Sequence, residues 1–167
     1  MRNDRSLNGW IIVLMALLSG PNHATDLVPT RLLGLDPARD IATAAVAACR
    51  KEGYQVAVVV TDRSGDPVVI MRDVFVSKYM VEIARNKANA VVMSNSSSGE
   101  LRTNMARIRE ELNELDGVLL MEGGLPIRVN GGLIGAVGVS GAPGGDKDEA
   151  CARAGIEAVQ ERLDFAD

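Results

Sequence analysis

Residues 122–127 read Glu-Gly-Gly-Leu-Pro-Ile, and residues 135–152 read Gly-Ala-Val-Gly-Val-Ser-Gly-Ala-Pro-Gly-Gly-Asp-Lys-Asp-Glu-Ala-Cys-Ala. The glycine-rich loop 140–146 lies between a strand-like apolar run and a pattern with helical spacing. Glycines in such a loop let backbone N–H groups point outward, where the N-terminus of a helix can hold an anion. The alternative is a tight turn in which Asp146 already caps the helix, in capping-box spacing with Glu149.

The rest of the chain alternates between strand and helix patterns. Asn130-Gly131 between two apolar runs is a strong signal for a type I′ hairpin. Asp36 is a favourable helix cap, and Gly53 is a favourable stop. The predicted strands are residues 55–61, 67–72, 118–122, 125–129 and 133–139. The predicted helices run from Asp36 to Gly53 and over residues 77–93, 100–112 and 146–163, with a polar loop at 94–99.

Hairpins dominate this order, which predicts an antiparallel sheet with helices packed on it, an α/β (α+β) fold. The 167 residues are enough for one domain. Aromatic residues make up only 3% of the chain, so the core must be built from aliphatic side chains. The net charge is −4 and no basic stripe is present, which argues against a nucleic-acid partner.

Residues 1–24 have the order of a secretory signal peptide. Arg2 and Arg5 precede an apolar run at residues 10–18, and small or polar residues follow as far as Ala24. The run is about half of the ~20 residues that a membrane span needs. We therefore expect residues 25–167 to form a single domain that is periplasmic or extracellular, without a membrane span. The alternative is an uncleaved anchoring segment.

The expected cleavage removes the only histidine, His23, from the mature protein. Catalytic triads with histidine, histidine-based zinc sites and histidine-ligated heme are then excluded. The only cysteines are Cys49 and Cys151. An oxidising compartment permits a disulfide between them. The interpretation we favour from sequence is two unbridged residues on buried helix faces, since free cysteine is commonly buried.

Residues 121–155 resemble the signature of the GlcG/HbpS heme-binding family, "GGLPI … GAIGVSGAPGGDKDEACA". The resemblance continues more loosely from Asp36 through the first hairpin and the helix at 82–88. It implies a profilin-like five-stranded antiparallel sheet flanked by helices and a homo-oligomer, often an octamer. It also implies heme as a cofactor and a sensor kinase as a possible partner.

The chain departs from that family between the first hairpin and the helix that follows. Relatives commonly carry a glycine-rich segment there that ends in His or Leu and Thr, whereas this chain has Val-Phe-Val-Ser-Lys-Tyr-Met at residues 74–80. Tyr79 then stands where some relatives have histidine. A tyrosine phenolate can ligate ferric heme, methionine can be an axial ligand, and Lys78 can pair with a propionate. The alternative is that Phe75, Tyr79 and Met80 pack in the core or an oligomer interface.

Three functions are compatible with these patterns. The first is a secreted or periplasmic heme-binding or heme-responsive accessory protein, and the second is a binding protein for a small organic acid or other metabolite. The third, with least support, is an enzyme using Glu82, Arg85, Lys87, Glu122 or Asp146, of which Glu82 and Arg85 are also spaced for a surface ion pair. The predicted ligand-binding residues are Lys78, Tyr79 (a candidate ligand of heme iron), Met80, Arg85, Ser140, Gly141, Gly144, Gly145 and Asp146.

Overall fold

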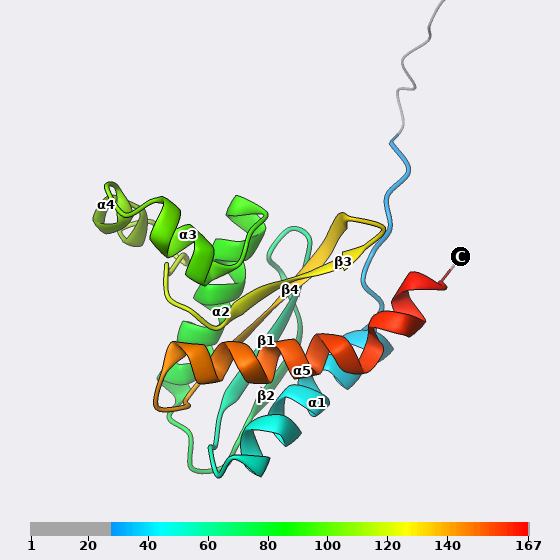
Figure 1. Cartoon of the computed structure of the whole chain (residues 1–167), viewed down its shortest axis with the longest axis horizontal. Helices are drawn as coiled ribbons and strands as arrows, with labels where there is room; N and C mark the ends of the chain where they lie inside the picture. The colour runs from blue at the N-terminus through cyan, green and yellow to red at the C-terminus, as the bar shows by residue number, and fades with distance from the viewer. Residues whose placement is uncertain (1–27, 167) are drawn as a thin grey trace, which may run out of the picture. The chain divides into compact units, whose positions relative to one another are not determined.

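A four-stranded antiparallel sheet organises the part of the chain that the computed structural model describes, residues 28–166 (Figure 1). The strand order is β2-β1-β4-β3, so that the two hairpins are joined through β1 and β4 at the centre. The predicted signal peptide, residues 1–24, lies outside the described residues. The strands are β1 (Ala57–Asp62), β2 (Pro67–Arg72), β3 (Gly124–Val129) and β4 (Gly132–Ser140).

Helices cover both faces of this sheet. Helices α1 and α5 lie side by side across one face, and α2 covers the other (Figure 1). The larger core lies between the sheet and the α1–α5 pair, and its buried side chains are mainly valine, alanine, isoleucine and leucine. The helices are α1 (Leu35–Lys51), α2 (Lys78–Ser94), α3 (Ser98–Asn104), α4 (Arg109–Asn113) and α5 (Gly145–Asp164).

Small residues let α2 approach the sheet closely. A Cβ atom built on Gly138 of β4 would lie 1.9 Å from the carbonyl oxygen of Ala84. Ala84 and Ala88 are fully buried on the same side of α2. Glycine is therefore required at position 138 because α2 packs directly against β4 at this point.

A disulfide joins Cys49 of α1 to Cys151 of α5, with the two Cα atoms 5.4 Å apart. The interpretation of these residues as two unbridged cysteines was therefore wrong. A bridge requires α1 and α5 to be neighbours, and this adjacency depends on how both helices pack on the sheet. The spacing of 102 residues along the chain could not reveal it.

The expected fifth strand is not found among the described residues, and residues 118–122 are irregular. Their backbone groups are bonded to other parts of the domain instead. The N–H of Leu119 donates to the carbonyl oxygen of Asn86 at 3.1 Å, and that of Leu120 donates to Asn113 Oδ1 at 2.9 Å. The apolar run is explained by the burial of Leu120 among Ala90, Leu101 and their neighbours rather than by strand pairing.

Two helix predictions also need correction. The helix expected over residues 100–112 is two short helices, α3 and α4, separated by a turn. Helix α1 begins one residue before Asp36, with Gly34 at the cap position and no side-chain cap. The carboxylate of Asp36 instead lies in the first turn and pairs with Arg39 at 3.0 Å.

Several predictions from the sequence are confirmed. Asn130 and Gly131 have φ angles of 49° and 79°, as a type I′ turn between β3 and β4 requires. Residues 95–97 connect α2 to α3, so the loop expected over residues 94–99 is present but shorter, and Ser97 and Glu100 form a capping box at the start of α3.

Across residues 28–166, no helix combines the length and the apolar character that a membrane span requires.

Candidate functional site

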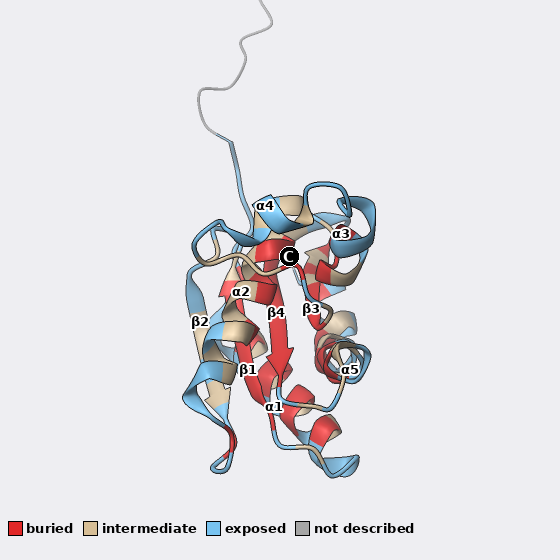
Figure 2. Ribbon diagram, turned by 90° about the vertical axis from the view of Figure 1, so that its left-hand side faces the viewer, coloured by how far each residue is buried: buried red, intermediate tan, exposed pale blue. Residues whose placement is uncertain are grey.

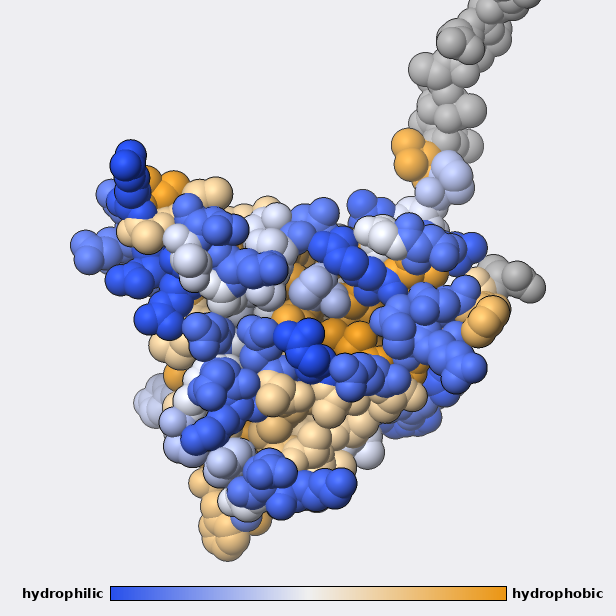
Figure 3. All heavy atoms as spheres, viewed as in Figure 1, coloured by the Kyte–Doolittle hydropathy of each residue, from blue (hydrophilic) through white to orange (hydrophobic). Residues whose placement is uncertain are grey.

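An exposed apolar surface lies at the start of α2. Val74, Phe75 and Tyr79 leave 77%, 86% and 65% of their surface exposed, and Lys78 Nζ lies 5.3 Å from the centre of the Tyr79 ring. We call these four residues the Tyr79 surface. Apolar atoms gather at the lower end of the molecule in Figure 3, where Figure 1 places the connection between β2 and α2. The alternative that Phe75 and Tyr79 pack in the core is therefore wrong, and the alternative that they pack in an oligomer interface stays a prediction.

The connection between β2 and α2 presents these side chains because its other members are anchored. Asp73 and Val76 are buried, and the N–H of Asp73 donates to the carbonyl oxygen of Val56 at 3.0 Å. Ser77 caps α2 by accepting a hydrogen bond from the N–H of Tyr79. The buried residues hold the segment to the sheet, and the intervening ones project outward.

Met80 turns toward the sheet rather than outward with Tyr79. The hydroxyl of Ser140, at the end of β4, donates to Met80 Sδ at 3.5 Å. The structure thus brings together Met80 and Ser140, two predicted ligand residues that lie 60 positions apart in the sequence. Of the two neighbours on α2, Tyr79 is exposed and Met80 is half-buried.

The glycine-rich loop is closed by Asp148, which the sequence analysis did not single out. Asp148 Oδ1 accepts from the N–H of Ala142 at 3.0 Å, and Asp148 Oδ2 pairs with Lys87 Nζ at 2.7 Å. Lys87 Nζ also donates to the carbonyl oxygen of Val139 at 2.9 Å. Lys87 and Asp148 are both buried, at 1% and 3% exposure. Together they tie the loop to α2 and β4.

Burial raises the pKa of the Asp148 carboxyl above its ordinary value, while Lys87 and the N–H of Ala142 act in the opposite direction. A signal for this pair exists in the sequence. Lys87 falls on the otherwise apolar face of the predicted helix 77–93, where a buried lysine needs a partner of opposite charge. Asp146, Asp148 and Glu149 near the start of α5 are all candidate partners for Lys87, and the sequence alone does not choose among them.

The expectation that Asp146 caps α5 is wrong. Gly144 occupies the cap position without a side-chain hydrogen bond, and Asp146 lies exposed in the first turn. Gly145 packs closely against Glu122. A Cβ atom built on Gly145 would lie only 2.7 Å from the Cβ atom of Glu122. Carboxylates around this helix end make it a poor site for an anionic ligand.

Arg85 lies apart from the loop. Its guanidinium pairs with Glu82 at 3.0 Å, as the i,i+3 spacing predicted. It lines a depression formed with Asn89 and the turn between β1 and β2. Arg85 Nε, although buried, has no hydrogen-bond partner within the described part of the chain.

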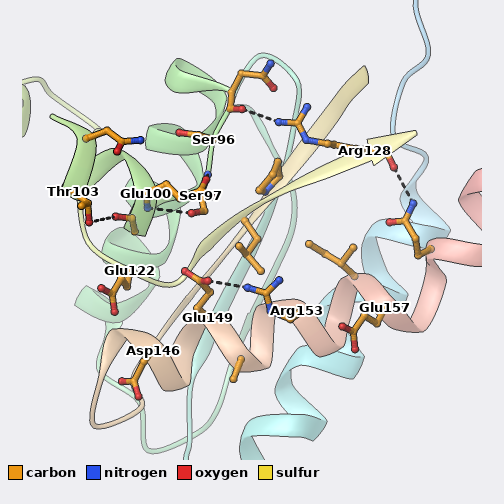
Figure 4. Close-up of a pocket in the computed structure, with 18 residues that line it drawn as sticks. Ser96, Ser97, Glu100, Thr103, Glu122, Arg128, Asp146, Glu149, Arg153 and Glu157 are labelled. Atoms are coloured by element: carbon orange, nitrogen blue, oxygen red, sulfur yellow. Dashed lines mark hydrogen bonds and ion pairs between the residues drawn. The ribbon is translucent and has the colours of Figure 1, made fainter. Parts of the chain in front are cut away.

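A larger groove runs between α3, β3 and α5, with a volume of about 930 Å³ (Figure 4). Its floor is apolar, with Leu125, Pro126 and Ile156, and Figure 3 shows this apolar floor bordered by polar residues. Arg153 of α5 pairs with Glu149 of the same helix at 2.9 Å. Its lining carries five acidic residues and two arginines, Arg128 and Arg153, and no group of three potential metal ligands is found in the described residues. The acidic residues of the lining are Glu100, Glu122, Asp146, Glu149 and Glu157.

Comparison with known proteins identifies relatives. The profile of a family described as "Haem degrading protein HbpS-like" matches residues 33–157. The crystal structure of HbpS is similar, with a TM-score of 0.75 and 36% sequence identity over 80% of this chain and 94% of HbpS. A double mutant of HbpS from Streptomyces reticuli gives a TM-score of 0.76 and 30% identity over 95% of this chain and 98% of the other.

A heme complex of PduOC has the same fold. Its TM-score is 0.68, with 24% identity over 77% of this chain and 95% of PduOC. At this identity the likeness concerns the fold alone. Among curated proteins, no sequence matches this chain.

Proposed function

Because the chain belongs to the HbpS-like family of haem degrading proteins, we propose that it is a heme-binding, heme-responsive protein whose heme lies against the Tyr79 surface. The observation that carries this proposal is the exposure of Tyr79 beside Phe75 and Lys78 at the start of α2. Bound heme would supply a ferric iron, which a tyrosine phenolate can ligate.

The residues of the Tyr79 surface fit the chemistry of heme. The macrocycle is flat and apolar, and Val74 and Phe75 offer apolar area that is otherwise in contact with water. The ammonium group of Lys78 can pair with a propionate carboxylate. Met80 is less suited as an iron ligand, because its sulfur already accepts a hydrogen bond from Ser140.

The glycine-rich loop has a supporting role in this proposal. Ser140 donates a hydrogen bond to Met80, and the Lys87–Asp148 ion pair joins α2 to α5 next to the loop. These contacts fix the position of α2 relative to the glycine-rich loop. Direct ligand contacts from Arg85, Gly141, Gly144, Gly145 and Asp146 stay predictions. The groove between α3, β3 and α5 also gives little support to a small organic acid as ligand, since its five acidic residues outnumber its two arginines and like charges repel.

We propose binding rather than turnover as the primary activity. Of the acid–base candidates, Glu82 and Arg85 pair with each other, and Lys87 is buried in an ion pair. Glu122 lies 3.7 Å from Arg102. The proposal also includes export by the segment 1–24, self-association, and an accessory role with a sensor kinase as partner. The disulfide supports export, because such bonds persist in oxidising compartments.

Titration of the purified protein with hemin tests the proposal. Wild type is expected to shift the Soret band and to saturate at a fixed stoichiometry. Tyr79→Phe is expected to weaken binding by at least about 10-fold, since an iron ligand is lost. Tyr54→Phe is the matched control, because Tyr54 is the other tyrosine of the chain and packs against the larger core instead of standing exposed.

Two results would overturn the proposal. One is the absence of a saturable Soret shift with wild type. The other is equal hemin affinity in wild type and Tyr79→Phe, which would leave heme binding intact but remove it from the Tyr79 surface.

A further inference from the structure

The depression that Arg85 lines lies between α2 and the turn that joins β1 to β2. Its volume is about 480 Å³, within the range of about 300–1,000 Å³ that is usual for small-molecule sites. Figure 2 shows α2 in front of the sheet, with tan and blue segments that mark its half-buried and exposed residues. Part of the lining is apolar, and its members are Pro67, Val92 and Met93.

Two buried polar atoms at this depression have no hydrogen-bond partner among residues 28–166. Arg85 Nε carries a hydrogen to donate, and Asn89 Oδ1 is an acceptor. The two residues are four positions apart on α2, so their side chains lie on the same face of the helix. A buried donor or acceptor without a partner costs stability. A ligand that offers one acceptor and one donor side by side would satisfy both atoms.

The amide of Asn89 is held so that its oxygen faces the turn between β1 and β2. Its Nδ2 donates to the carbonyl oxygen of Gly117 at 2.9 Å. Its Oδ1 lies next to Gly65, where an added Cβ atom would be only 3.0 Å away. Gly65 also has a φ angle of 93°, so both its conformation and the space beside it require glycine. The acceptor therefore faces the opposite wall of the depression.

Opposite charges line the two walls. On α2, the guanidinium of Arg85 pairs with Glu82, but their side chains are 42% and 57% exposed, so this pair contributes little stability and a ligand carboxylate can compete with it. On the turn, Asp66 is exposed, and its carboxylate forms no ion pair with another described residue. Both buried atoms are covered by exposed parts of these walls, which a ligand reaches them by displacing. A ligand with one negative and one positive group matches this arrangement.

We infer that this depression binds a small zwitterion, an α-amino acid with a compact apolar side chain. The ligand carboxylate accepts hydrogen bonds from the Arg85 guanidinium, including its Nε. The ligand ammonium group donates to Asn89 Oδ1 and lies near the carboxylate of Asp66, and the ligand side chain contacts Val92. The site is separate from the Tyr79 surface, because Asn89 lies ten residues beyond Tyr79 on α2, about 15 Å along the helix axis.

Isothermal titration calorimetry of the heme-free full-length protein with L-valine tests this inference. Wild type is expected to bind L-valine saturably at millimolar concentrations. Two analogues separate the charged groups, since isovalerate lacks the ammonium group and isobutylamine lacks the carboxylate. Each is expected to bind at least about 10-fold more weakly, because it leaves one polar atom of the site unpaired. The absence of saturable L-valine binding, or equal affinities for L-valine and isovalerate, would overturn the inference.

Variants test the location of the site. Arg85→Met is expected to weaken L-valine binding at least about 10-fold, since the partner of the carboxylate is lost. Arg39→Met is the matched control, because Arg39 forms the same kind of i,i+3 ion pair, with Asp36 at 3.0 Å, on the surface of α1. Asp66→Asn is expected to weaken binding of L-valine and to leave that of isovalerate unchanged.

Equal L-valine affinities in wild type and Arg85→Met, with unchanged far-UV circular dichroism, would contradict this placement. Because no hemin is present in these titrations, their outcome is independent of the proposed heme site.

Discussion

At the scale of single residues, the domain depends on two buried carboxylates with different partners. Asp148 pairs with the buried Lys87, and Asp73 pairs with the largely exposed Arg50. Each carboxylate also accepts a backbone N–H, from Ala142 and Val56 respectively, and so fixes a loop next to the candidate site. A buried carboxylate without such partners would be costly.

Removal of the Lys87 ammonium should expose the dependence of Asp148 on it. Lys87→Met is expected to lower the free energy of unfolding by about 3–5 kcal/mol, because it leaves a buried carboxylate unpaired. Adding Asp148→Asn should recover most of this loss, since the amide oxygen still accepts from Ala142. Urea unfolding measures both. The control is Lys147→Met, because Lys147 is an exposed lysine next to Asp148 in the sequence. If Lys87→Met lowers the free energy of unfolding no more than this control does, the role of the Lys87–Asp148 pair is refuted.

Asp73 should make the protein sensitive to acid. Burial acts to raise the pKa of its carboxyl, but hydrogen bonds from Arg50 and from the N–H of Val56 hold that pKa below its ordinary value. A lowered folded-state pKa contributes stability above the unfolded pKa of ~3.9, and this contribution is lost as pH falls through the folded pKa. Wild type should therefore lose stability below about pH 4.

The Asp73→Asn variant checks this assignment. At pH 7 it should be less stable by about 1–2 kcal/mol, from the weakened hydrogen bonds, and its stability should fall less steeply with acid. Asp116→Asn, on an exposed carboxylate, is expected to follow wild type. Equal acid slopes for wild type and Asp73→Asn would assign the acid sensitivity to other groups.

At the scale of elements, sequence predicts local structure better than contacts between elements. The hairpin at Asn130-Gly131 was predictable because its turn requires positive φ at both positions. The strand predicted at 118–122 was wrong, because the hydrogen bonds to Asn86 and Asn113 that replace strand pairing are tertiary. The Lys87–Asp148 pair and the disulfide also depend on which helices become neighbours.

The same limit applies to the candidate site. Tyr79 and Lys78 could be singled out because the chain departs there from the family pattern. That Met80 turns toward Ser140 while Tyr79 faces outward depends on the rotation of α2 relative to β4. Asp146 does not cap α5. Asp148, two residues further along the helix, instead accepts a hydrogen bond from the N–H of Ala142 and so holds the glycine-rich loop.

The disulfide should be a major support of the α1–α5 layer. It closes a loop of about 100 residues, for which the chain-entropy account gives about 4.7 kcal/mol. Cys49→Ala combined with Cys151→Ala should lower the free energy of unfolding by that order in urea. Both cysteines are buried, so the folded wild type should resist reducing agents that act readily on the unfolded chain. Equal stability of wild type and the double variant would contradict this role.

At the scale of the whole molecule, the blocked and open sides of the domain are distinct. The α1–α5 layer and the β3 edge are closed by the disulfide and by Ser98, Pro126 and Gln160. The β2 edge, where β1 is the one strand neighbour among the described residues, and the start of α2 together expose apolar side chains. Ligand binding is therefore expected on this open side.

The central claim is that Tyr79 ligates heme iron, and resonance Raman spectroscopy of the ferric hemin complex tests it most directly. We predict iron–phenolate vibrations in wild type and in Tyr54→Phe, and their loss in Tyr79→Phe. Phenolate vibrations that persist in Tyr79→Phe, or that are absent from wild type saturated with hemin, would contradict it.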